Sequence, residues 1–141
     1  MDRMQWPLEA LYESEDGRLS PVQIQKTLFL VGANLPDEMG SDYYHFEPYH
    51  YGPFDSAIYE DLEHLVEQGF VMRVASSKHS GKDFEITPEG RRAIERQRPS
   101  AAVSTYIKSV VAWMRPLSFS ALVSAIYTKY PEFKVNSVFR G

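Results

Sequence analysis

The chain has 141 residues, 43% of them hydrophobic, and a formal net charge of −4. These values are typical of one globular domain and oppose the excess of Lys and Arg that most nucleic-acid binders carry. The chain has no cysteine, which excludes disulfides and thiolate zinc sites. No apolar run approaches about 18 residues, and no signal-peptide core is present, so we expect a cytoplasmic protein without a membrane span.

The first third of the chain predicts two helices. Residues 4–12 have apolar side chains on one side at helical spacing. Ser20 and Pro21 form an N-cap followed by a first-turn proline, which is a strong start for a helix over 22–35. The apolar stripe of this second helix indicates that it packs against the core.

Residues 43–54 are rich in aromatic side chains and favour a short strand or extended segment. Pro48 restricts this segment to an edge position, because proline has no N–H for a sheet ladder. Gly52-Pro53 predicts a turn. Asp55 then predicts the N-cap of a helix over 56–68.

Two strands follow, over 70–76 and 83–86, and the polar loop between them predicts a β-hairpin. Thr87 and Pro88 predict the start of a helix that runs to about residue 98. Apolar spacing then predicts two more helices, over 103–114 and from Ser118 or Ser120 to Tyr130.

A helical cluster followed at once by a hairpin is typical of the winged-helix arrangement. The sequence therefore predicts a mostly α (α+β) protein. It would be one winged-helix-like domain over 1–141, with a two-stranded β-hairpin and added C-terminal helices. The helix over 56–68 would hold the place of the recognition helix.

That helix is a poor reader of DNA. It has no Lys or Arg, and with its cap it carries five acids: Asp55, Glu60, Asp61, Glu63 and Glu67. Carboxylates facing a phosphate-lined groove are repelled. Two interpretations stay open for this face, a protein-binding surface and a merely solvated acidic surface.

The basic side chains gather on the hairpin and the helix after it. They are Arg73, Lys78, Lys82, Arg91, Arg92 and Arg96. A DNA-binding transcriptional regulator that uses this patch is the alternative function, and ordinary surface solubility explains the same residues.

The sequence offers little for catalysis or metal binding. His45 and Glu47 alternate onto one face with His50 nearby, but this spacing matches no stringent zinc motif. Phosphate-loop, dinucleotide and nucleophile-elbow motifs are missing. We expect no catalytic residue, no metal and no cofactor.

Two segments resemble a known family. The segment over 24–30 is similar to the lysine-containing helix of the SocA-like antitoxins, also called the Panacea domain, and of the related YwgA-like proteins. The Tyr-Gly-Pro segment over 49–54, followed by 58–62, resembles their second signature. The tail over 130–137 is similar to YwgA-like tails.

The resemblance implies a compact, mostly helical fold and a role in binding a partner protein, with no catalytic residues. A toxin encoded nearby is the partner that it suggests. Candidate partner-binding residues surround the Tyr-Gly-Pro segment: Lys26, Tyr43, Tyr49, Tyr51, Gly52, Pro53 and Tyr59.

Two further expectations concern contacts of this region. We expect the stem of Lys26 to cover Tyr49 or Tyr51, with its ammonium near Glu47 or Asp55. The tail over 133–139 alternates apolar and polar residues, so it could pair as a strand with a partner or with a second copy in a homodimer.

Overall fold

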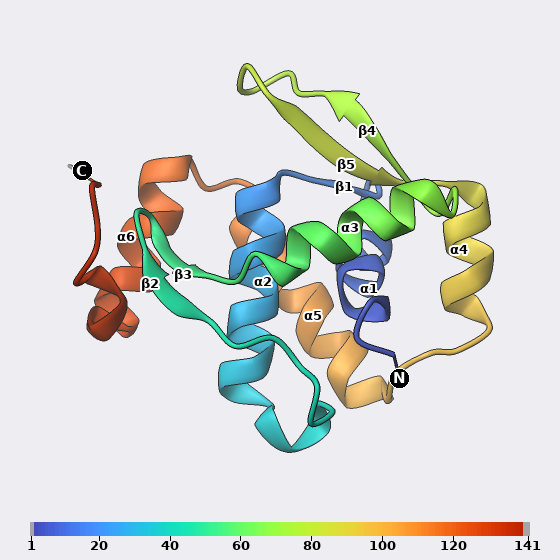
Figure 1. Cartoon of the computed structure of the whole chain (residues 1–141), viewed down its shortest axis with the longest axis horizontal. Coiled ribbons are helices and arrows are strands. Elements are labelled where there is room, and N and C mark those ends of the chain that lie inside the picture. Colours follow the sequence, from blue (N-terminus) through green and yellow to red (C-terminus); the bar gives the residue numbers. More distant parts are fainter. Residues whose placement is uncertain (1, 140–141) are drawn as a thin grey trace.

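The computed structural model describes residues 2–139 and has the α+β class that the sequence predicts (Figure 1). The helices are α1 (Gln5–Glu13), α2 (Pro21–Asn34), α3 (Ala57–Glu67), α4 (Pro88–Glu95), α5 (Ala101–Met114) and α6 (Phe119–Lys129). Two short 3₁₀ helices are η1 (Pro36–Glu38) and η2 (Pro131–Lys134). The strands are β1 (Arg18–Leu19), β2 (Glu47–Tyr49), β3 (Gly52–Phe54), β4 (Val71–Ala75) and β5 (Lys82–Ile86).

Three helix starts follow from local side-chain capping, as predicted. Ser20 forms a reciprocal capping box with Gln23, in which each side chain accepts a hydrogen bond from the other residue's N–H. The Thr87 and Ser118 hydroxyls accept hydrogen bonds from the N–H groups of Gly90 and Ala121 and so cap α4 and α6. These caps satisfy N–H groups that would otherwise have no partner at a helix start.

The prediction of Asp55 as the N-cap of α3 is wrong. Helix α3 has Ser56 as its N-cap, without a side-chain capping bond, and Asp55 accepts from the Ala57 N–H instead.

The predicted β4–β5 hairpin is present, but it belongs to a three-stranded antiparallel sheet in the order β1-β5-β4. Arg18 pairs with Glu85 and Leu19 with Phe84, which adds β1 to the hairpin. The sequence did not reveal β1, because two residues are too short for a period-two pattern.

The core lies between the helices and one face of this sheet. A large apolar cluster joins α1, α2, α3, α5 and the sheet, and a smaller one joins α2, α5 and α6. Figure 1 shows α4 at one end of the molecule and α6 with η2 at the opposite end. Among the described residues, no helix is long and apolar enough to cross a membrane.

One prediction about the second half of the chain is wrong. Helix α4 ends at Glu95 rather than near residue 98, and 96–100 connects it to α5. Within the single chain the tail over 133–139 forms no strand: it turns through η2, and the Val138 N–H donates to the His50 carbonyl at 2.9 Å. Val135 and Val138 stay exposed, and strand pairing with a partner or a second copy stays a prediction.

The core also contains ionisable side chains. Asp61, in α3, accepts two hydrogen bonds from the Arg3 guanidinium and one from the Tyr44 hydroxyl at 2.5 Å. Glu9, in α1, is fully buried, and one of its oxygens lies 3.2 Å from an Arg98 nitrogen. Burial, followed by the proximity of Glu13, raises the pKa of Glu9 to about 8.

Candidate functional site

The aromatic segment forms a second hairpin, β2–β3, which lies beside α6 (Figure 1). The turn is made by His50 and Tyr51, so the prediction that Gly52-Pro53 is the turn is wrong by two residues. Gly52 begins the return strand with φ +110°, a conformation that side chains with a Cβ rarely adopt. Pro48 pairs with Pro53, which is tolerated because a two-stranded sheet consists only of edge strands.

Side chains of helix α2 form hydrogen bonds with the end of this hairpin. Gln25 exchanges two hydrogen bonds with the Asp55 backbone, at 2.9 and 3.1 Å. The Lys26 ammonium donates to the Pro53 carbonyl at 3.3 Å. These three bonds attach the end of the hairpin to α2.

Lys26 differs from the expectation drawn from sequence. Its side chain is only 4% exposed, and its ammonium contacts the Pro53 carbonyl instead of Glu47 or Asp55. Within the described part of the chain it forms no ion pair, and burial lowers its pKa to about 8. Lys26 therefore supports the hairpin from the interior and is not itself an accessible contact.

The outer face of the hairpin is aromatic. Tyr49 is 48% exposed and stacks on His50 and Phe54, with ring centroids 4.3 and 4.7 Å away. Tyr51 is 42% exposed and meets Phe119 edge to face at 5.1 Å.

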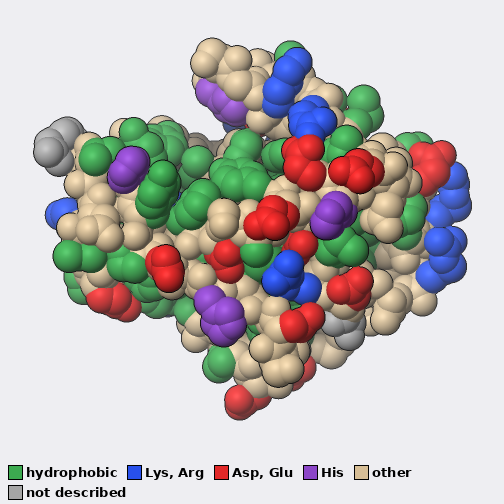
Figure 2. All heavy atoms as spheres, viewed as in Figure 1, with side chains coloured by type: hydrophobic (Ala, Val, Ile, Leu, Met, Phe, Trp, Pro, Cys, Tyr) green, Lys and Arg blue, Asp and Glu red, His purple; other side chains and the backbone are tan. Residues whose placement is uncertain are grey.

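Phe119, at the start of α6, is itself 44% exposed. The tail adds Val138, which is also exposed and is bonded to the turn. We call Tyr49, Tyr51, Phe119 and Val138 the aromatic surface. Figure 2 shows hydrophobic side chains gathered over this end of the molecule.

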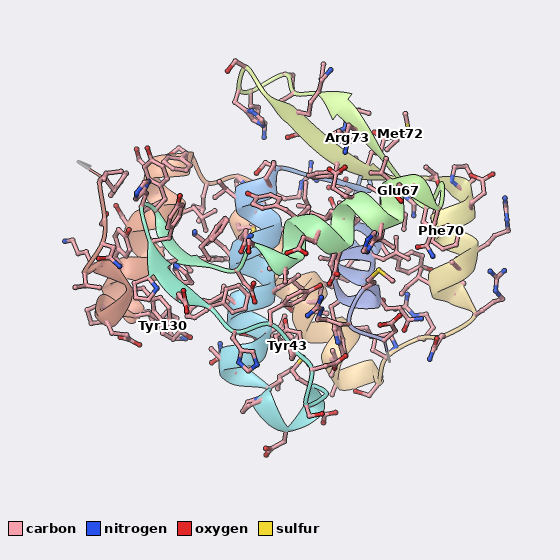
Figure 3. All side chains as sticks on the ribbon, in the orientation of Figure 1. Tyr43, Glu67, Phe70, Met72, Arg73 and Tyr130 are labelled. Atoms are coloured by element: carbon pink, nitrogen blue, oxygen red, sulfur yellow. The ribbon has the colours of Figure 1, made fainter. Side chains whose placement is uncertain are left out.

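The other predicted partner-binding residues are not on this surface. Tyr43 is buried, and its hydroxyl donates to the Leu28 carbonyl at 2.6 Å, so its placement in an exposed patch is wrong (Figure 3). Tyr59 is half-buried behind Phe54, and burial raises the pKa of its hydroxyl. Gly52 and Pro53, the first two residues of β3, are buried. The order of these residues in the sequence predicted that they lie near the hairpin, but it could not predict which of them face the core and which face solvent.

Phe119 was missed, whereas Val138 belongs to the tail over 133–139 that we expect to contact a partner. They stand about 70 and 90 residues from the Tyr-Gly-Pro segment in sequence and reach it only through α6 and the tail. Phe119 follows a serine cap, so its place in the first turn of a helix was predictable. Its exposure was not, because it depends on tertiary packing.

The solvent face of α3 is acidic, as predicted. Glu60, Glu63, His64 and Glu67 are exposed, while Asp61 points inward to Arg3 and Tyr44. Figure 2 shows acidic side chains gathered across the middle of this face.

The predicted basic patch is partly neutralised by neighbouring acids. Arg73 pairs with Glu63, and Arg92 pairs with Glu89. Figure 3 shows Arg73 on β4 above the end of α3. The guanidinium of Arg91 lies over the ring of Tyr12, in α1, 5.9 Å from its centroid.

Lys78, Lys82 and Arg96 are exposed. They stand at the hairpin tip, on β5 and after α4, so the six basic residues do not form one compact cluster.

No cluster of three metal-binding side chains exists among residues 2–139. His45 and His50 are both exposed, and the His45 backbone N–H is bound by the Asp55 carboxylate at 2.8 Å. We found no protein-family model, no curated protein and no solved structure that matches this chain.

Proposed function

We propose that this chain is a protein-binding module of the antitoxin or adaptor type, which acts by direct contact and not by catalysis. It binds its partner through the aromatic surface of Tyr49, Tyr51, Phe119 and Val138. The observation that carries this proposal is the exposure of two tyrosines on a hairpin that α2 anchors by hydrogen bonds from the interior.

Exposed tyrosine on a rigid support is typical of protein interfaces. A tyrosine ring gives a large contact area at little cost in side-chain entropy, and its hydroxyl stays satisfied by water or by the partner. Contiguous apolar surface on a monomer is itself an indication of a binding site. A toxin encoded nearby remains the partner that the sequence resemblance suggests.

The finer description of the fold is part of this proposal. We infer that α1 to β5 form a winged-helix-like unit in which α3 holds the place of the recognition helix and β4–β5 is the wing. The sheet order β1-β5-β4 and the succession of helices support this description. Helices α5 and α6 are then the added layer, and α6 contributes Phe119 to the aromatic surface.

The acidic face of α3 supports a protein partner over DNA. Its exposed carboxylates would meet phosphates, which they repel. The ion pairs of Arg73 and Arg92 leave less free positive charge than the sequence alone suggests. The DNA-binding regulator therefore stays the alternative function, and the same experiment tests it.

The test compares capture of partners by the full chain and by two variants. A double variant, Tyr49→Ala and Tyr51→Ala, removes the two exposed rings. The matched control is Trp113→Ala, which removes another exposed aromatic side chain, on α5. We expect the double variant to lose the partner that the wild type captures, while the control keeps it. Urea unfolding of all three chains checks that the fold is retained.

Equal capture by the double variant and the wild type would refute the aromatic surface. Duplex DNA is tested in parallel at rising salt, with Arg91→Glu and Arg92→Glu together as the DNA variant. Salt-sensitive DNA binding that this variant removes, without any captured protein, would favour the alternative function.

A further inference from the structure

A groove of about 620 Å³ adjoins the aromatic surface. Its lining residues come from the β4–β5 hairpin, the start of α2 and the start of α6. Figure 1 shows the positions of these three segments. Leu19 and Leu122, both buried, line its apolar part together with Val22. Phe119 lies at its rim. The volume is in the range of sites that hold several side chains of a ligand.

Two helices begin at this groove. Ser20 and Ser118, the N-cap residues of α2 and α6, both line it. Neither helix has an acidic residue in its first turn. The partial positive charge at a helix start therefore has no carboxylate of its own helix to balance it, and it favours an anion.

The ionic side chains of the groove agree with this polarity. Three cations, Arg18, Lys78 and Arg115, line it with two carboxylates, Asp16 and Asp83. Arg18 is paired with Glu85 at 2.8 Å, and Asp83 lies 2.9 Å from His79. Arg115 is fixed by hydrogen bonds to Asp16 at 2.5 and 2.9 Å. Within residues 2–139 the exposed Lys78 side chain forms no ion pair, so its ammonium is available at the hairpin tip.

We propose that this groove binds a short linear segment of the partner protein in which an apolar side chain stands close to a carboxylate. The apolar side chain packs on Val22 and Phe119, and the carboxylate meets Lys78 and the start of α6. The inference rests on the proposed function, because it describes a second part of the same interface. Phe119 contacts Tyr51 and also lines the groove, so the two parts are continuous.

The test uses fluorescein-labelled ten-residue peptides of glycine and serine that carry one leucine or phenylalanine one to four residues before an aspartate. Control peptides carry lysine in place of aspartate, or serine in place of the apolar residue. Versions with an amidated end and with a free carboxyl end distinguish a side-chain carboxylate from a terminal one. Fluorescence polarisation with the full chain measures the affinity.

We expect saturable binding of the apolar–acidic peptides with Kd below about 1 mM, and none of the control peptides. Lys78→Glu should weaken binding about tenfold, because the charge near the carboxylate reverses. Lys82→Glu is the matched control: it makes the same change on the same hairpin, outside the groove lining. Val22→Asp puts a carboxylate inside the groove at a helix start that tolerates it, and should abolish binding.

Equal binding of the acidic and lysine peptides would overturn the proposal, as would equal loss in the Lys78 and Lys82 variants or no binding of any peptide. The Tyr49 and Tyr51 double variant separates this inference from the proposed function. It should lose the partner but keep the short peptides. If Lys78→Glu and Val22→Asp both capture the partner normally while the tyrosine variant does not, the groove proposal fails and the proposed function stands.

Discussion

Lys26 gives the sharpest test of the energetics of this fold. Lys26 is 4% exposed, and within the described chain its ammonium donates to the Pro53 carbonyl at 3.3 Å and forms no ion pair. Burial of a charge without a counter-charge is unfavourable. We therefore predict that replacing Lys26 with methionine, an apolar side chain of similar length, stabilises the protein at pH 7.

The magnitude follows from the pKa. Burial lowers the pKa of Lys26 from 10.5 to about 8, and this difference corresponds to about 3 kcal/mol of destabilisation at neutral pH. Methionine removes that cost but leaves the Pro53 carbonyl without its donor, which costs about 1 kcal/mol. We expect Lys26→Met to raise the free energy of unfolding by about 2 kcal/mol at pH 7.

The pH dependence gives a second, independent readout. Between about pH 8 and 10.5 the unfolded chain binds a proton at Lys26 that the folded chain does not, so the wild type gains stability as pH rises through this window. The methionine variant lacks this gain. The advantage of the variant should be full below pH 8, vanish near about pH 9.5, and become a disadvantage of about 1 kcal/mol by about pH 10.5, because the variant still lacks the donor to the Pro53 carbonyl.

Urea unfolding of both chains at intervals from pH 6 to 10.5, followed by far-ultraviolet circular dichroism, measures this difference. Comparing the two chains at each pH cancels the titration of all other groups. A variant less stable than the wild type at pH 7, or a difference that does not change with pH, would refute the argument. A more stable variant that no longer captures the partner would indicate that the lysine is kept for function.

Three further predictions concern the core. Asp61→Ala removes the 2.5 Å acceptor of the Tyr44 hydroxyl and the ion-pair partner of Arg3, so urea unfolding should show a free energy lower by roughly 2–4 kcal/mol, and Asp61→Asn should lose less. The pKa of Glu9 is raised to about 8, so the wild type should lose stability as pH rises from about 4.5 to 8. Glu9→Gln should remove that loss. Its free energy of unfolding at pH 8, measured by urea unfolding across the same pH range, should exceed that of the wild type by more than about 1.4 kcal/mol. In Gly90→Ala the new Cβ would lie 2.1 Å from the Phe70 carbonyl oxygen, so thermal unfolding should show a loss of more than about 2 kcal/mol, although alanine usually favours a helix; an unchanged melting temperature would contradict this contact.

The sequence alone determined the elements whose signals are local. Ser20 with Pro21 and Thr87 with Pro88 predicted two helix starts, because capping involves residues within one turn of each other. Gly69 predicted the end of α3, and it adopts φ +81° there. The acidic character of α3 was equally visible, since the helical period sorts side chains onto faces without reference to the rest of the chain.

Only the tertiary structure decided which of the aromatic residues are exposed. Tyr43 and Tyr49 belong to the same aromatic segment, yet one is buried against α2 and the other forms the candidate interface. The partner of Lys26, the third strand β1 and the return of the tail to His50 are contacts between residues distant in sequence. Such contacts depend on how whole elements pack, and no local spacing records that. The surface that we propose for binding exists only because α6 and the tail bring Phe119 and Val138 to the hairpin.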